Sequence, residues 1–330
     1  MTLSFVKQRS DRRAFIKCGA GLFTSLLKPI SGIAIPAQRT RPLQSSINQP
    51  IGIAANGGRL IVGEYEGGRL LEIDLKANWL EVLCGDPRSK CPGLPSLKFP
   101  RTIVFRNPDE FFVVESRGIL SVEPDRCRAR YIVSTGLGAR QLAPAGAVVD
   151  AKGAVYYIDR SNRLFRMIEG SNAVLLDSSA GLKCANSLNP LALLPDGDLV
   201  IAASGNQRVY RFSVRSRRLD VIAGTGASLS NGDEGPAIRA NLRLPMSVTV
   251  DAAGNIFIGE NGRVRMVRSN DSKILTVAVV AGVPGGLAVV GSQLYVADPA
   301  SNVIRAVNLD AGTMKTIAGN GLPHRPTTFK

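Results

Sequence analysis

The residues of this chain that could do chemistry include a short acidic loop. The loop opens the stretch SNGDEGPAIRANLRLPMSVTVDAAGNIFIG, residues 230–259, and sets the carboxylates of Asp233 and Glu234 among glycines. Closely spaced oxygen ligands are what a hard cation such as Ca²⁺ requires. Asp side chains also order turns by accepting hydrogen bonds from nearby backbone N–H groups. The choice between a metal site and a structural turn depends on where the loop lies in the fold.

Histidine chemistry has little support in this sequence. The chain has one histidine, His324, in the tail GLPHRPTTFK. A site built from several imidazoles acting as ligands or bases therefore cannot form. Candidate nucleophiles have no base beside them in the predicted turns: Ser116, Ser161, Ser204 and Ser301. We predict no metal and no cofactor, and the absence of a catalytic set argues against an enzyme.

The cysteines indicate a disulfide. Four of the five follow residue 37: Cys84, Cys91, Cys127 and Cys184. Four cysteines allow three pairings, and the short loop CGDPRSKC favours Cys84–Cys91. Buried thiols are the alternative, while irregular spacing and the lack of accompanying histidines disfavour zinc.

Residues 1–37 read as an export signal. Arg12 and Arg13 precede Phe15, Ile16 and a modestly apolar run, a pattern that resembles a twin-arginine signal. The alternative is an ordinary basic amphipathic N-terminus. The pattern predicts a bacterial protein that works in the periplasm or is secreted. The whole chain carries a formal charge of +15, and removing the leader would leave about +10.

The remainder of the chain is a repeat. Six similar segments, each with short apolar runs and glycine turns, begin at prolines: Pro50, Pro100, Pro144, Pro190, Pro245 and Pro284. The spacings are 50, 44, 46, 55 and 39 residues. Periods of about 40–50 residues with several strands per copy are typical of β-propellers.

Each copy also ends in a β-branched segment that predicts a fourth strand: 80–85, 131–136, 173–177, 219–224, 276–282 and 314–319. We therefore predict an all-β protein, a six-bladed β-propeller of four-stranded antiparallel blades. It spans residues 50–319, after a polar lead-in over 38–49 and before a tail over 320–330. No apolar run is long enough to span a membrane.

The connector GTGASLSNGDEGPAIRANLRL, residues 224–244, resembles the blade connector of NHL-repeat proteins. Asp233, Gly235, Pro236 and Ala237 match its Gly-Asp-x-Gly-Pro-Ala-like core, whereas the other connectors diverge. The resemblance implies that Asp233 orders a turn by bonding local N–H groups rather than holding a metal.

Antiparallel strands place the second-to-third strand turns and the blade-to-blade connectors on one face. Five of the six second strands end there in an acid: Glu64, Glu115, Asp159, Glu260 and Asp298, with Ala203 in the fourth copy. These carboxylates could bind a cation or act as acid and base. Alternatively, each pairs with the arginine that follows it: Arg69, Arg117, Arg163, Arg263 and Arg305. Since nearly every blade repeats this acid, we favour architecture.

The residues after the prolines open the inner strands at the predicted channel mouth: Ile51, Arg101, Ala145, Leu191, Met246 and Gly285. In the similar gluconolactonase/regucalcin propellers, an Asn and an Asp at such places help hold a divalent cation, and none of these six offers a side-chain oxygen. This argues against a calcium-dependent lactonase. Arg101 could receive a carboxylate or phosphate, or pair with Glu64 or Glu115.

The opposite face carries arginines in two third-to-fourth strand loops: Arg126, Arg128, Arg130, Arg215, Arg217 and Arg218. They form a basic patch for an anionic polymer or membrane surface, or simply a solvated face. Sparse aromatics and export argue against nucleic acid.

The sequence thus predicts an exported, monomeric NHL-type propeller that binds an envelope protein or an anionic ligand, with Arg101 and Met246 near the centre of the binding face. The alternative is a hydrolase or lyase of the lactonase-like propeller group with a non-standard site.

Overall fold

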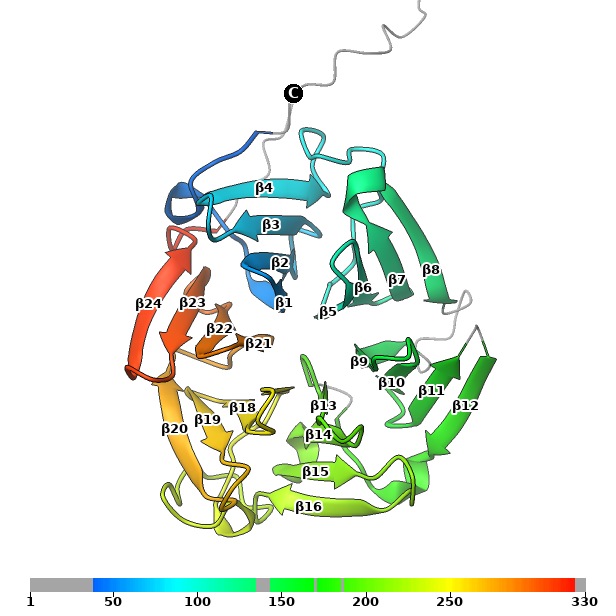
Figure 1. Cartoon of the computed structure of the whole chain (residues 1–330), viewed down its shortest axis with the longest axis vertical. Helices are drawn as coiled ribbons and strands as arrows, with labels where there is room; N and C mark the ends of the chain where they lie inside the picture. Colours follow the sequence, from blue (N-terminus) through cyan, green and yellow to red (C-terminus); the bar gives the residue numbers. More distant parts are fainter. Residues whose placement is uncertain (1–37, 135–142, 169–170, 185–186, 324–330) are drawn as a thin grey trace, which may run out of the picture. The chain divides into compact units, whose positions relative to one another are not determined.

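The computed structural model describes residues 38–134, 143–168, 171–184 and 187–323, which form six four-stranded antiparallel sheets around one axis (Figure 1). Each sheet, or blade, is built from four consecutive strands that run from the axis to the rim. This confirms the predicted six-bladed β-propeller. No helix in the described residues is long and apolar enough to cross a membrane.

The first three blades contain twelve strands. Blade 1 comprises β1 (Pro50–Asn56), β2 (Arg59–Glu64), β3 (Leu70–Asp74) and β4 (Trp79–Cys84). Blade 2 comprises β5 (Thr102–Asn107), β6 (Glu110–Glu115), β7 (Gly118–Glu123) and β8 (Arg128–Ser134). Blade 3 comprises β9 (Pro144–Val149), β10 (Val155–Asp159), β11 (Leu164–Ile168) and β12 (Ser171–Leu176).

The other three blades follow the same pattern. Blade 4 comprises β13 (Leu191–Leu193), β14 (Leu199–Ala203), β15 (Arg208–Phe212) and β16 (Leu219–Ala223). Blade 5 comprises β17 (Ser247–Val250), β18 (Ile256–Glu260), β19 (Arg263–Val267) and β20 (Ile274–Val279). Blade 6 comprises β21 (Leu287–Val290), β22 (Gln293–Asp298), β23 (Val303–Asn308) and β24 (Thr313–Ala318). The helices in the described residues are short 3-10 turns: η1 (Pro42–Gln44), η2 (Pro124–Arg126), η4 (Ser178–Ala180), η5 (Ser204–Asn206) and η6 (Ala237–Arg239).

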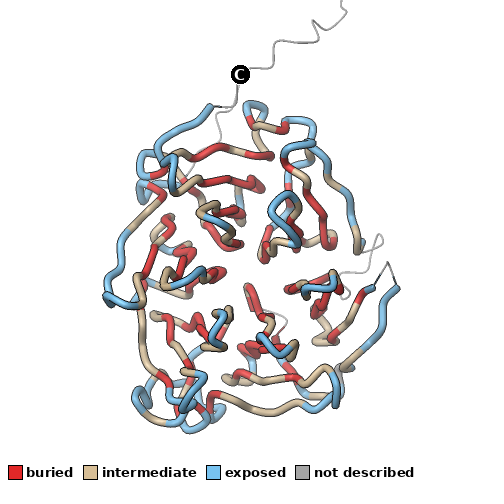
Figure 2. Tube along the Cα trace, in the orientation of Figure 1, coloured by how far each residue is buried: buried red, intermediate tan, exposed pale blue. Residues whose placement is uncertain are grey.

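Hydrophobic packing lies between the blades rather than within any one of them. Each of the six buried clusters joins side chains from two adjacent blades. Between blades 1 and 2, for instance, Leu70 packs in one cluster with Phe111 and Leu120. Because a sheet has two faces, a blade buries one face against each neighbour, and the second strands are buried along nearly their whole length (Figure 2).

Glycine ends several of the fourth strands, and the backbone explains why. Gly224 follows β16 with φ of 93°, and a Cβ there would lie 2.4 Å from the backbone oxygen of Gln207. Gly319 follows β24 with φ of 88°, and a Cβ there would lie 2.4 Å from the backbone oxygen of Asn302. Only glycine tolerates both the left-handed backbone and this close approach, so the Ala-Gly endings mark where the strands stop.

The lead-in joins the last blade to the first. Thr40 pairs with Leu80 of blade 1, while the N–H of Gly319 after blade 6 donates to the backbone oxygen of Pro42 over 2.9 Å. Ile47, fully buried, belongs to the cluster between these two blades. Since each sheet contains only consecutive strands, the ring closes through this segment and not through a shared blade.

Candidate functional site

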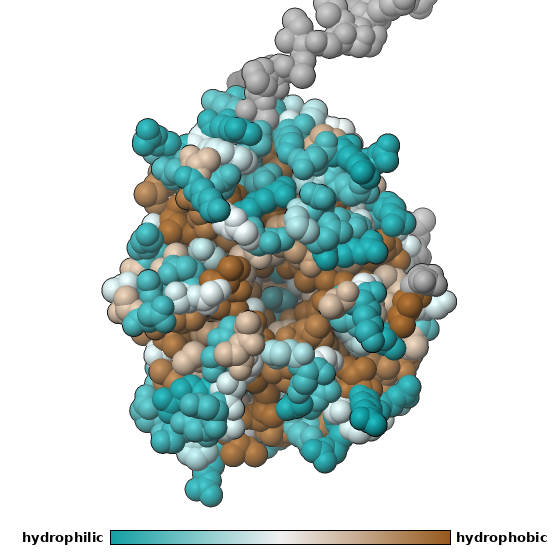
Figure 3. Space-filling model, viewed as in Figure 1, coloured by the Kyte–Doolittle hydropathy of each residue, from teal (hydrophilic) through white to brown (hydrophobic). Residues whose placement is uncertain are grey.

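A cavity of about 270 Å³ lies where the innermost strands of all six blades meet. Its lining comprises Asn189 and residues 53–55, 102–105, 147–149, 191–193, 248–250 and 287–289. Thr102, Asn189 and Thr249 are the polar ones, and none of these described residues is titratable. Figure 3 shows the hollow at the centre of the ring, bordered largely by hydrophobic residues.

The cavity lies on the side of the turns that join the first and second strands of each blade. Its lining runs to the last strand residues before those turns, such as Val149 and Val250, and omits Arg101 and Met246. The other end is narrowed by residues 187–189. There the backbone N–H groups of Leu188 and Asn189 donate to the Met246 oxygen over 2.8 and 3.1 Å. The ligand-accessible hollow therefore faces away from the predicted binding face.

Asn189 lines the cavity but has one atom without a partner that the cavity does not reach. The residue is 7% exposed, and its Oδ1 is fully buried without a hydrogen bond. The hydroxyl of Thr102, by contrast, lies 3.4 Å from the Leu188 oxygen. An unsatisfied buried acceptor costs about 1–3 kcal/mol, and this oxygen is not accessible to a ligand in the hollow.

The acids that end the second strands lie outside the cavity lining and are engaged in ion pairs. Four of the five predicted pairs are present: Glu64–Arg69 (2.5 Å), Glu115–Arg117 (2.7 Å), Asp159–Arg163 (2.8 Å) and Asp298–Arg305 (2.7 Å). Each of these carboxylates is at most 1% exposed. Glu64 and Glu115 also accept backbone N–H groups of the incoming connectors, Asn48 over 2.9 Å and Lys98 over 2.6 Å. These contacts support an architectural role.

The fifth pair differs from the prediction. Glu260 lies 3.7 Å from Arg265, not beside Arg263, and accepts hydrogen bonds from Ser230 and the Arg243 N–H, both over 2.6 Å. Arg265 is two residues further along β19, on the same face as Arg263, and its side chain is completely buried beneath the connector. Burial raises the pKa of the Glu260 carboxyl, against the effect of these hydrogen bonds and charges.

Asp233 also departs from the expected local role. Its carboxylate accepts two hydrogen bonds from Arg265, over 2.9 and 2.6 Å, and one from Thr276 over 2.7 Å. It therefore fastens the connector to blade 5 instead of bonding nearby N–H groups. Partial burial alone would raise the pKa of Asp233, but the bonds from Thr276 and Arg265 lower it. The described residues include no group of three or more His, Cys, Asp or Glu side chains placed to hold a metal.

Arg101 does not pair with either acid that the sequence offered it. Its guanidinium lies 5.8 Å from the centroid of the Tyr65 ring, and its Nη2 is 3.5 Å from the Tyr65 hydroxyl. Phe99 packs against the same ring, with 4.7 Å between centroids. The oxygens of Glu64 and Glu115 are already used by their own arginines and connectors.

The predicted disulfide is wrong in its pairing. Cys91 bonds to Cys127, with 5.2 Å between their Cα atoms, and links the connector after blade 1 to the β7–β8 hairpin. Cys84 ends β4 as a free thiol, with its side chain in the core between blades 1 and 2. Burial raises the pKa of the Cys84 thiol to about 11 and that of Cys184 to about 12.

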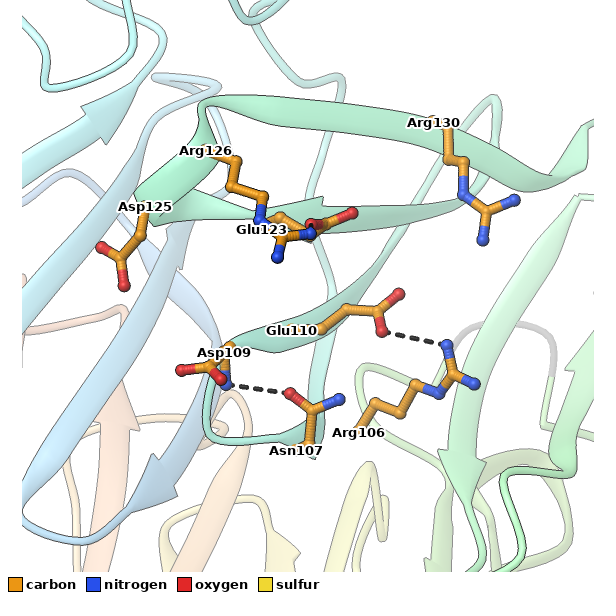
Figure 4. A pocket seen from close by; sticks show the side chains of 8 residues that line it. All are labelled: Arg106, Asn107, Asp109, Glu110, Glu123, Asp125, Arg126 and Arg130. Atoms are coloured by element: carbon orange, nitrogen blue, oxygen red, sulfur yellow. Dashed lines mark hydrogen bonds and ion pairs between the residues drawn. The ribbon is translucent and has the colours of Figure 1, made fainter.

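The six patch arginines lie in two separate groups. The β7–β8 and β15–β16 hairpins that carry them are separated on the rim by blade 3 (Figure 1). Around the first lies an open hollow of about 490 Å³, in which four acids offset three arginines (Figure 4). Arg126 pairs there with Glu123 over 2.9 Å, and in the second group Arg218 pairs with Asp220 over 2.7 Å. Exposed pairs of this kind contribute little to stability. The two groups of arginines do not form one continuous basic surface.

Sequence reasoning missed the residues that line the cavity. It considered the position after each proline, whereas the polar lining residues lie before it (Asn189), two positions after it (Thr102) and four after it (Thr249). The one sequence signal that could have identified these residues was the alternation of side chains along the inner strands. These short strands have irregular entries, such as the register shift between Pro50 and Gly52, so alternation could not be counted from the prolines.

Comparisons with known proteins identify a fold and no family. No family model and no curated protein sequence matches the chain, so the NHL resemblance and the twin-arginine signal stay predictions. Many solved structures are similar. A Bacteroides thetaiotaomicron protein of unknown function aligns with a TM-score of 0.67 and 15% identity, over 82% of this chain and 72% of that chain.

Two further structures show the range of roles found on similar folds. An auxiliary nutrient binding protein from Bacteroides thetaiotaomicron has a TM-score of 0.60 and 12% identity, over 82% of this chain and 70% of that chain. A gluconolactonase from Xanthomonas campestris has a TM-score of 0.58 and 19% identity, over 80% and 87%. At such identities the likeness shows the β-propeller fold alone, since one fold supports unrelated functions.

Proposed function

We propose that this protein is a binding propeller of the bacterial envelope that holds a small ligand in its axial cavity without transforming it. The observation that carries this proposal is the cavity wall, which in the described residues has no acidic or basic side chain. The acids that could have done chemistry are paired elsewhere. The unpaired edges of the six inner strands also face the axis, so backbone N–H and C=O groups are available there for hydrogen bonds to a ligand.

Filling the cavity should abolish binding. Thr249 lies in the lining and is partly exposed, so Thr249→Trp would occupy the hollow from its open side. We expect the affinity for benzyl alcohol, a small probe with an aromatic ring and one hydroxyl group, to fall at least tenfold, as measured by calorimetric titration. Thr249→Val keeps the side-chain size and should bind as the parent does. Equal benzyl alcohol binding by parent and Thr249→Trp, or none by either, would contradict the proposal.

A lactonase-like hydrolase is the second candidate. It is favoured by the fold likeness to a gluconolactonase. The described lining offers amide and hydroxyl oxygens but no carboxylate, which does not fit a site for a divalent cation. Metal analysis after dialysis against Ca²⁺ separates the two candidates. One bound ion per chain together with lactone hydrolysis would establish the enzyme.

A protein or anionic polymer of the envelope is the other candidate partner, for which the rim arginines and the Arg101–Tyr65–Phe99 cluster are the candidate contacts. The Cys91–Cys127 bridge fits a protein that works in an oxidising compartment.

Export through the twin-arginine route gives its own prediction. Arg12 and Arg13 lie outside the described residues. Changing both to Lys should leave full-length precursor in the cytoplasm, because the pair is the recognised element of such signals. Cell fractionation with immunoblotting measures this, and the change Lys28→Arg is the control. Normal export of the double variant would show that another route is used.

A further inference from the structure

We infer that a hollow in blade 2 is a second ligand site, and that it binds a small dipolar molecule whose anionic and cationic groups are several bonds apart. Arg130 and Arg106 hold the anionic group, and Asp109 holds the cationic one. The inference is independent of the axial cavity and of the function proposed for it.

The blade 2 hollow has a volume of about 490 Å³ and lies between the β5–β6 turn and the β7–β8 hairpin (Figure 4). Its eight described lining residues all carry a charged or an amide side chain. An apolar ligand is disfavoured there, because it would remove water from charged groups without replacing their hydrogen bonds. The wall therefore suits a hydrophilic ligand.

The charges of the hollow pair with one another except for two. Three of the four acids each have a cation beside them: Glu110 with Arg106 (2.9 Å), Glu123 with Arg126 (2.9 Å) and Asp125 with Lys90 (2.7 Å). Among the described residues, none forms an ion pair or a side-chain hydrogen bond with the Arg130 guanidinium or the Asp109 carboxylate. The hollow thus offers a ligand one cation and one anion.

These two charges lie at opposite ends of the hollow. Figure 4 shows the guanidinium groups of Arg130 and Arg106 on one side and the carboxylate of Asp109 on the other. The strand register agrees with this view. Glu123 pairs with Arg128 where the β7–β8 hairpin closes, and Arg130 lies two residues further along β8, about 7 Å away. A ligand that reaches both charges must carry its own charges at the two ends of a short chain.

The anionic end of the ligand meets two guanidinium groups. Ser121 lies opposite Arg130 in the register, and its hydroxyl donates to Glu110 over 2.6 Å. The other Glu110 oxygen accepts from Arg106 over 2.9 Å. This carboxylate therefore positions Arg106 and leaves Arg130 without a counterion. Guanidinium groups form strong, directional hydrogen bonds with carboxylate and phosphate groups.

Both walls of the hollow are fastened to neighbouring parts of the chain. The disulfide Cys91–Cys127 ties the tip of the β7–β8 hairpin to the connector after blade 1. Arg59 of blade 1 donates to the Pro108 oxygen in the β5–β6 turn over 3.1 Å. A site whose walls are already held in place loses less entropy when a ligand binds.

Probes that differ by one charged group test the site. 6-Aminohexanoate carries a carboxylate and an ammonium group at the two ends of a methylene chain, whereas hexanoate and protonated hexylamine each carry one of them. We expect the parent protein to bind 6-aminohexanoate about fivefold more tightly than either, as is usual for one exposed charge pair. Calorimetric titration at low ionic strength measures this. Glycine, whose charges are adjacent, should show no such advantage over hexanoate.

Two variants assign the ends of the ligand. Arg130→Gln should bind 6-aminohexanoate no better than hexylamine, and Asp109→Asn should bind it no better than hexanoate. Both side chains belong to exposed residues, so neither change disturbs the core. Arg215→Gln makes the same change of charge on the β15–β16 hairpin, away from the hollow, and should bind as the parent does.

Equal affinities of the parent for 6-aminohexanoate, hexanoate and hexylamine, or no binding of any of them, would overturn the inference. Equal losses in Arg130→Gln and Arg215→Gln would do the same, because the effect would then come from overall charge. Thr249→Trp should leave 6-aminohexanoate binding unchanged. A loss in that variant would assign the probe to the axial cavity and reject a separate site in blade 2.

Discussion

Replacing Arg265 by Met is expected to lower the free energy of unfolding by about 3–5 kcal/mol. The side chain is completely buried and bridges three elements, with hydrogen bonds to Asp233 and to the Asn241 oxygen and with Glu260 at 3.7 Å. Its removal leaves the fully buried Glu260 carboxylate without its nearest cation. Urea unfolding followed by tryptophan fluorescence and circular dichroism measures the change.

Arg268→Met is the matched control, because Arg268 pairs with Asp271 over 2.7 Å on the same blade but in a partly exposed position. We expect a loss below about 1 kcal/mol there. Adding Glu260→Gln to Arg265→Met should recover part of the stability, since the uncompensated charge is then gone. Equal small losses in both single variants would show that the buried arginine does not hold the connector.

The penalty of Arg265→Met should also depend on pH. Burial raises the folded-state pKa of Glu260, so its contribution to stability is greatest when the group is protonated and is lost as the pH rises through that pKa. The variant should therefore lose less stability at pH 5 than at pH 7. Asp233, whose pKa is lowered, titrates below this range and acts in the opposite sense.

Reducing the Cys91–Cys127 disulfide is expected to cost about 3–4 kcal/mol, because the bridge closes a loop between cysteines 36 positions apart. At about 2–4 °C per kcal/mol, Tm should fall by roughly 10 °C. Differential scanning calorimetry with and without dithiothreitol measures this. The double variant Cys91→Ser/Cys127→Ser should start at the lower Tm and not respond to the reductant.

Cys84→Ala distinguishes the bridge in the structure from the one favoured by sequence spacing. Its own buried thiol is lost, so some destabilisation is expected. The drop in Tm on reduction should nevertheless persist in full. A variant that no longer responds to dithiothreitol would show that Cys84 takes part in the bridge.

Much of the architecture could be predicted because each blade is encoded locally. The proline starts, the period-2 strands and the Ala-Gly endings recur in every copy or in several, and the structure places strands at all six predicted fourth-strand segments. The acid–arginine pairs could be predicted for the same reason, because the two partners are close in sequence. Asp159 and Arg163, for example, lie at the two ends of one turn.

Contacts between blades were harder to predict from the sequence. Arg265 was overlooked because its partner Asp233 lies 32 residues away, in a connector that crosses to blade 5. The disulfide was misassigned for a similar reason, since loop length says nothing about which way a strand's last side chain points. Cys84 points into the core between blades, and Cys91 is carried out to the next hairpin.

The sequence by itself determined the number of blades, their strands and the pairing within each turn, because these depend on residues close together along the chain. Only the tertiary structure decided where the hollow lies, which residues line it and that Asn189 is left without a partner. Six inner strands and the 187–189 segment build that cavity together. Side chains from distant copies meet there at angles that no single repeat encodes.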